Sequence, residues 1–202
     1  MKFVFAAMAL TLGMASAAQA YDADIEAIID GQKPGKAMAR QSVSTLMAGA
    51  EAWCYDEMRG ACSWREVYLD VRQDGVTFEL ANYYALDIDY AFTDQGVFRG
   101  NKICQSGFNW LPSLRASYRT DGRMMGGRDL QDFRLAMTEA RPRIDSYSDC
   151  FDYLYVSSDA AKDTVTLLQR QYDNEGYYPA GDVEVTLHFD KESAAALKLR
   201  ED

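Results

Sequence analysis

Residues 62–92 read CSWREVYLDVRQDGVTFELANYYALDIDYAF, and this stretch decides the predicted fold. Its apolar side chains at Val67, Leu69 and Val71 alternate with polar ones, and the alternation resumes after a turn at Gln73-Asp74-Gly75. A period of two is typical of antiparallel strands with one face in the core. We therefore predict that a β-meander begins here and that Val67, Leu69 and Val71 point inward.

The alternation from residue 76 to residue 92 is too long for one strand. At roughly 3.3 Å per residue it would extend about 56 Å, which exceeds the length of ordinary strands. We therefore predict a bend or break near Asn82. Asp94-Gln95-Gly96 has turn composition and predicts the next turn.

Together with the remaining patterns, this meander predicts an α+β fold with an antiparallel sheet. Helical spacing predicts two to four helices, and period-two alternation predicts a second meander. Residues 36–104 and 128–190 share an order of helix, cysteine and strand, for which a weak internal duplication and coincidence are both explanations. The predicted helices cover 22–30, 36–50, 129–140 and 191–200, and the predicted later strands cover 150–156, 164–172 and 183–189.

The first twenty residues have the pattern of a secretory signal. Lys2 precedes an apolar run that ends near Met14, and Ala18-Gln19-Ala20 is typical of a signal-peptidase site. A short N-terminal core helix is the alternative. Cleavage after Ala20 would leave 21–202 as one globular domain, placed in the periplasm or secreted.

The four cysteines favour disulfides over metal binding. They all follow the predicted signal, and an even number of cysteines in an exported chain indicates disulfide pairs. Four cysteines allow three pairings, of which we favour Cys54 with Cys62 and Cys104 with Cys150. A four-thiolate zinc site is the alternative, but the cysteines lack its paired short spacing.

The charge of the chain limits its partners. The formal net charge is −10, and loss of Lys2 with the signal would make it −11. So acidic a chain is a poor candidate for nucleic acid or anionic membranes, and it favours a cationic partner. No mature segment is apolar enough to predict membrane insertion.

No motif in the sequence predicts a catalytic centre, a metal site or a cofactor. His188 is the only histidine, and strand alternation places it on an outward face. Residues 171–182 only partly follow the calcium-loop pattern, because Gln171 stands where an aspartate is expected. Carboxylate pairs are abundant, but outward polar positions on a sheet explain them better than a catalytic pair does.

Aromatic and acidic side chains share one face of the first meander. Rings among carboxylates bind sugars by stacking or cationic peptides by cation–π contact. The alternative, which we favour, is that the arginine-rich segment 111–143 covers this face internally. The predicted binding residues are Trp64, Glu66, Tyr68, Asp70 and Tyr83.

These observations favour a non-catalytic periplasmic or secreted binding or interaction protein. A cationic protein or a cell-envelope glycan is the expected partner. The alternatives are a small glycan-acting hydrolase of the cell envelope that uses a carboxylate pair, and a purely structural envelope component.

Overall fold

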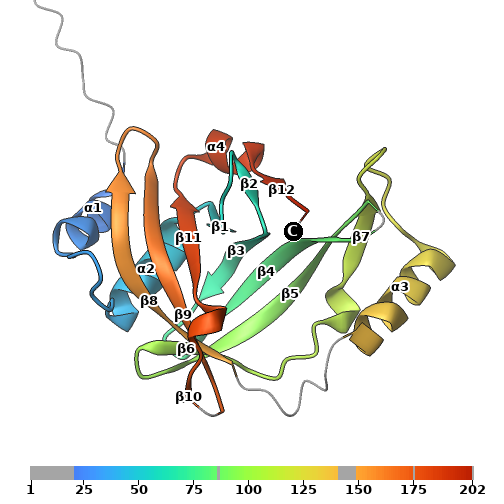
Figure 1. The fold of residues 1–202 in the computed structure, drawn as a ribbon, viewed down its shortest axis with the longest axis horizontal. Coiled ribbons are helices and arrows are strands. Elements are labelled where there is room, and N and C mark those ends of the chain that lie inside the picture. Colours follow the sequence, from blue (N-terminus) through green and yellow to red (C-terminus); the bar gives the residue numbers. More distant parts are fainter. Residues whose placement is uncertain (1–20, 86, 141–148, 175, 202) are drawn as a thin grey trace, which may run out of the picture.

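The computed structural model describes residues 21–85, 87–140, 149–174 and 176–201 (Figure 1). The predicted signal peptide, residues 1–20, and its cleavage site lie outside the described residues. Within the described part of the chain, none of the helices combines the length and the apolarity needed to cross a membrane.

Strands dominate the structure. They account for 45% of it and are accompanied by four helices. The strands are β1 (Ala52–Tyr55), β2 (Ala61–Cys62), β3 (Trp64–Val71), β4 (Gly75–Tyr84), β5 (Ile88–Arg99), β6 (Lys102–Gln105), β7 (Arg115–Tyr118), β8 (Cys150–Asp159), β9 (Thr164–Asp173), β10 (Gly176–Tyr177), β11 (Val183–His188) and β12 (Lys198–Leu199).

The predicted α+β class is wrong, because the two meanders form one closed antiparallel barrel of eight strands. The order β9-β11-β1-β3-β4-β5-β6-β8 returns to β9, since β8 also pairs with β9. Strands from the two halves of the sequence meet at two seams, β1 with β11 and β6 with β8. The closure was not predicted because the alternation within a strand does not show which distant strand pairs with it. In addition, β1 is too short to show a period of two.

Two helices close one end of the barrel. The helices α1 (Ala23–Asp30) and α2 (Arg40–Gly49) confirm the predictions for 22–30 and 36–50. Leu46 and Met47 of α2 are fully buried in one cluster with Trp53, Val165 and Leu187, which come from inside the barrel. The burial of these apolar side chains between the helices and the barrel strands is the main contribution that stabilises this end of the barrel.

A second apolar cluster lies where β4 and β5 extend beyond the barrel. The helix α3 (Gly127–Ala140), which confirms the predicted helix 129–140, packs Phe133 against Tyr84 and Tyr90 with ring centroids 5.2 and 6.0 Å apart. The short helix η1 (Leu111–Ser113) and β7 complete this region beside α3 (Figure 1). The arginine-bearing helix therefore covers the outer part of the β4–β5 hairpin.

Two turn predictions need correction. The break near Asn82 lies further on, after Tyr84, where Asp87 adopts a φ of 59°. The turn predicted at Asp94-Gln95-Gly96 is wrong, because β5 runs through these residues. Gly96 meets a packing demand instead, since a Cβ there would lie 2.7 Å from the Ile103 side chain.

Over most of β3, the side chains point to the opposite face of the sheet from the one predicted. A bulge between Tyr68 and Asp70 shifts the register, and Leu69 is 56% exposed. The prediction that Leu69 and Val67 point inward is therefore wrong. Val67 lies between Glu66 and Tyr68, which point into the barrel, so its own side chain points outward. An extra residue reverses the alternation that follows it, so Val71 does pack against the core.

Both predicted disulfides are confirmed. Cys54 bonds to Cys62, and Cys104 bonds to Cys150. Cys104 and Cys150 are register partners across the β6–β8 seam, so this bond links the two sequence halves where the barrel closes. The C-terminal helix α4 (Lys191–Ala196) and β12 follow β11, and β12 runs parallel to β2.

Candidate functional site

A cavity of about 260 Å³ occupies the interior of the barrel. Eight-stranded barrels have an interior that side chains fill or that holds one small ligand. Both halves of the sequence contribute to the wall. The lining residues are Tyr55, Trp64, Glu66, Tyr68, Phe78, Leu80, Phe92, Asp94, Gln95, Gly96, Ile103, Cys104, Gln105, Asp149, Phe151, Tyr153, Gln169, Gln171, Gly181 and Val183.

Glu66 of β3 carries a carboxylate inside this wall. The Tyr55 hydroxyl donates a hydrogen bond of 2.9 Å to Glu66 Oε2, and the Tyr68 hydroxyl donates one of 3.1 Å to the same oxygen. The Tyr153 hydroxyl, from β8, interacts with both tyrosines. Among the described residues no donor contacts the other carboxylate oxygen, Oε1, which leaves it available to a ligand.

The pKa of Glu66 is raised to about 7, chiefly by burial and also by the nearby charge of Asp94, although the hydrogen bonds from Tyr55 and Tyr68 act to lower it. Although solvent reaches part of Glu66 through the cavity, protein surrounds the carboxyl group closely enough for loss of hydration to dominate. The same burial raises the pKa of Tyr55, Tyr68 and Tyr153, so all three hydroxyls keep their protons.

Aromatic rings form much of the cavity wall. Trp64 stacks on Tyr55, with centroids 4.6 Å apart and planes inclined by 14°. Tyr68 contacts Phe78 at 5.8 Å and packs at 5.1 Å from the fully buried Trp53 behind it. This packing fixes the ring faces that border the cavity, so a ligand would meet preformed aromatic surfaces.

Two buried acceptors at the cavity have no partner in the described part of the chain. Gln169 Oε1 belongs to a side chain only 6% exposed, and it forms no hydrogen bond. One oxygen of Asp149, Oδ1, is also buried and unpaired. Native proteins satisfy nearly all such groups, so an acceptor of this kind at a cavity can take a hydrogen bond from a ligand or from water.

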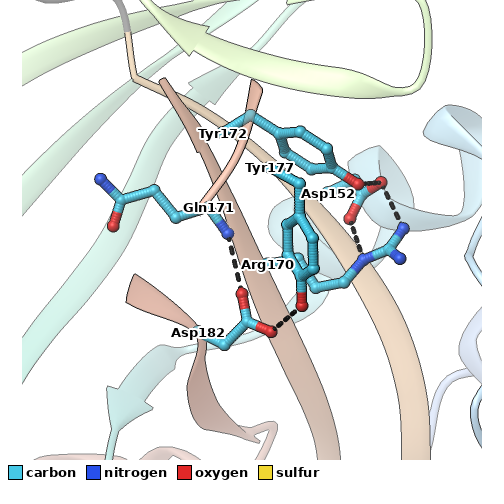
Figure 2. A network of polar contacts seen from close by, with 6 residues as sticks. All are labelled: Asp152, Arg170, Gln171, Tyr172, Tyr177 and Asp182. Carbon is cyan, nitrogen blue, oxygen red and sulfur yellow. Dashed lines mark hydrogen bonds and ion pairs between the residues drawn. The ribbon is translucent and has the colours of Figure 1, made fainter. Parts of the chain in front are cut away.

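A polar network fixes the end of the barrel near β10 (Figure 2). Arg170 donates two 2.7 Å hydrogen bonds to the Asp152 carboxylate, and the Tyr172 hydroxyl donates a third of 3.0 Å. Asp182 accepts from the backbone N–H of Gln171 at 3.2 Å and from the Tyr177 hydroxyl at 2.5 Å. Figure 2 shows the Gln171 side chain pointing away from these tyrosines and Arg170, and it lines the cavity.

The five predicted binding residues separate into two groups. Trp64, Glu66 and Tyr68 line the cavity, although we predicted them on an outward face. Asp70 follows the bulge and pairs with Arg72 at the surface. Tyr83 stacks under the Arg119 guanidinium, 4.4 Å from its ring centroid. The structure therefore brings three of the five together and leaves two elsewhere.

The outside of the barrel carries a second depression. It lies between Arg65, Arg115 and Arg119 on one side and the C-terminal Leu197–Leu199 segment on the other. Arg119 forms a 2.6 Å ion pair with Asp89, and Arg115 pairs with Glu79. Acidic partners therefore neutralise two of the three arginines, whereas Arg65 Nε is buried without a hydrogen bond in the described part of the chain.

His188 lies on the outside of β11, as predicted, but it is buried. Its Nε2 lies 2.8 Å from Glu57 Oε2, and its side chain is covered by the loop after β1. Cys54 is close enough to form a three-residue cluster with them. The Cys54 sulfur is bonded to Cys62, however, so it cannot serve as a thiolate ligand.

No protein-family model matches this sequence, and no curated protein is significantly similar to it. The function of the cavity is therefore inferred from the residues that line it.

The far wall of the cavity was not predicted from the sequence. Tyr153 and Gln169 line the cavity with Glu66 only because β8 and β9 close the barrel, whereas Tyr55 lies on β1, the neighbour of β3. One signal was present: Trp64, Glu66 and Tyr68 recur at every second position, so they had to share one face of a strand. A carboxylate flanked by two large aromatic rings is as typical of the wall of an internal cavity as of an exposed sheet face.

Proposed function

We propose that this chain is an exported, non-catalytic binding protein that holds a small ligand inside its barrel. The observation that carries the proposal is the cavity of about 260 Å³ with the Glu66 carboxylate in its wall. Ligand sites are typically concave and mostly apolar, with a few placed polar groups, and the mouths of β-barrels are common locations for them.

Export is supported by two independent features. The two disulfides are compatible with a periplasmic or extracellular protein, because such bonds persist in oxidising compartments. The sequence pattern of residues 1–20 is that of a cleavable signal. Mass analysis of the protein from its native host would test export, with Tyr21 expected as the first residue and no free thiols.

The size of the cavity favours a small ligand over a polymer. At about 30 Å³ per water-sized group, the cavity has room for roughly nine such groups. That is the size of one ring with a short substituent.

The proposal is tested with a pair of tryptophan variants of two leucines. Leu80→Trp fills the cavity, whereas Leu69→Trp adds the same bulk at an exposed position outside it. Saturation-transfer NMR would follow a set of soluble fragments of about nine non-hydrogen atoms, both charged and neutral. Binding that Leu69→Trp retains and Leu80→Trp loses supports the proposal. If no fragment binds the wild-type protein, the proposal is wrong.

A glycan-acting hydrolase is the second candidate, and one observation favours it. Glu66, with its raised pKa, and Asp94 line the same cavity, and hydrolases of this kind pair a protonated carboxyl group with an ionised one. Incubation with peptidoglycan fragments and mass spectrometry would test it. Products released by the wild-type protein but not by Glu66→Gln would replace the binding proposal with this one.

A further inference from the structure

The charged groups of the cavity are all acidic. Glu66, Asp94 and Asp149 line it, and no Lys, Arg or His does so among the described residues. Glu66 has no cationic partner among the described residues, and bringing a cation to such a buried carboxylate recovers the cost of its burial. The cavity therefore disfavours an anionic ligand and complements a cationic one.

The polar atoms of the cavity that lack a hydrogen bond are all acceptors. Gln169 Oε1 and Asp149 Oδ1 are buried acceptors without donors, and Glu66 Oε1 receives no hydrogen bond from the described residues. The tyrosine hydroxyls use their protons within the wall. A ligand with N–H or O–H donors therefore complements these acceptors, and a charged donor makes the stronger bond to a carboxylate.

The ring faces suit the same kind of ligand. Trp64 and Tyr55 form one stacked pair, and Phe78, Phe92 and Phe151 line other parts of the cavity. Aromatic faces attract cations, most strongly where water is excluded, and they also cover an apolar ring. Acidic groups beside aromatic faces are thus complementary to a cation on a short apolar body.

We propose that the ligand of this cavity is a small protonated amine on an aromatic or apolar body, with its N–H groups directed at the Glu66 carboxylate. This inference rests on the proposed function, because it names the ligand class for the same site. The need for N–H donors distinguishes a protonated amine from a quaternary ammonium group, which has the charge but no donor.

The test uses four probes built on one phenyl ring. Phenethylamine is cationic with N–H donors, 2-phenylethanol is its neutral counterpart, phenylacetate is anionic, and N,N,N-trimethylphenethylammonium is cationic without donors. Titration calorimetry on the full mature chain at pH 8 should show phenethylamine binding at least tenfold more tightly than each of the other three. Glu66→Gln should reduce its advantage over 2-phenylethanol to less than threefold.

The outcomes separate the two proposals. If 2-phenylethanol or phenylacetate binds as tightly as phenethylamine, and Leu80→Trp abolishes that binding, the cavity is a ligand site but the amine assignment is wrong. Equal binding of the quaternary probe would also overturn the assignment. If no probe binds, and no other fragment does, the proposed function itself fails. Thermal melting of each variant without ligand would verify that it is folded.

Discussion

The Tyr55 hydroxyl donates a 2.9 Å hydrogen bond to the Glu66 carboxylate inside the barrel. The two residues lie on the adjacent strands β1 and β3, and Tyr68 donates to the same oxygen from the strand of Glu66 itself. These bonds favour the ionised carboxylate, whereas burial disfavours it. The protonation state of Glu66 near neutral pH is therefore set by the balance between the two hydroxyl donors and the surrounding protein.

Removing one donor should shift that balance. Tyr55→Phe should raise the pKa of Glu66 by about one unit, because a hydrogen bond to a charged group contributes about 1.5 kcal/mol or more. Carbon-13 NMR of the glutamate carboxyl groups would measure it. Tyr21→Phe is the matched control, since its hydroxyl donates to the Thr164 carbonyl instead. An unchanged pKa in Tyr55→Phe would show that the hydrogen bond has no such role.

The raised pKa of Glu66 should make wild-type stability depend on pH. The folded pKa of about 7 lies above the ordinary value of 4.5, so the folded state retains a proton that the unfolded state releases between these values. The free energy of unfolding should therefore fall as pH rises from about 4.5 to 7, by at most about 3 kcal/mol. Urea denaturation at several pH values would measure this fall.

Glu66→Gln should abolish this contribution. Its stability relative to the wild-type protein should increase as pH rises from 4.5 to 7 and stay level above that range. Glu79→Gln is a control on the neighbouring strand, with its carboxylate on the outside of the barrel beside Arg115. Parallel pH profiles for Glu66→Gln and the wild-type protein would contradict the burial of Glu66.

Local patterns predicted the elements of this fold but not its closure. The predicted helix 129–140 corresponds to α3, and the predicted strand 164–172 corresponds to β9. Each was visible in one stretch of sequence. The pairing of β1 with β11 joins residues more than one hundred positions apart, and no local period reports such a contact.

The candidate site was only half visible for the same reason. Trp64, Glu66 and Tyr68 were identified, but their side of the sheet was inverted because we placed valine and leucine inward. In this barrel the larger rings of β3 face the interior before the bulge at Leu69, and of the three aliphatic positions only Val71, after the bulge, packs against the core. Tyr153 and Gln169 come from the opposite wall, which only the closed barrel brings close.

The two disulfides should differ in their contribution to stability. Cys104–Cys150 closes a loop of 46 residues and Cys54–Cys62 one of 8. Loop-closure entropy then gives losses of about 4 and about 2.5 kcal/mol on replacement of each cysteine pair by serine. Denaturant unfolding of the two double variants would measure these losses. A larger loss for Cys54–Cys62 would contradict the view that the seam bond holds the barrel closed.

The Arg170–Asp152 pair should stabilise the barrel beside β10. Both side chains are mostly buried, at 25% and 11% exposure, and the pair is bidentate. Asp152→Ala should cost about 2 to 4 kcal/mol, because it leaves Arg170 desolvated without its partner. Asp70→Ala, at the exposed Arg72 pair, should cost less than about 1 kcal/mol. Equal losses would indicate that the buried pair adds nothing specific.

The most direct measurement on the cavity is a carbon-13 NMR titration of the Glu66 carboxyl group, assigned by comparison with Glu66→Gln. In the free protein its pKa is expected to be about 7. Saturating phenethylamine is expected to lower that pKa by at least one unit, because a cation beside the carboxylate favours its ionised form. A Glu66 pKa near the ordinary 4.5, unchanged by the amine, would contradict both the buried carboxylate and the proposed amine site.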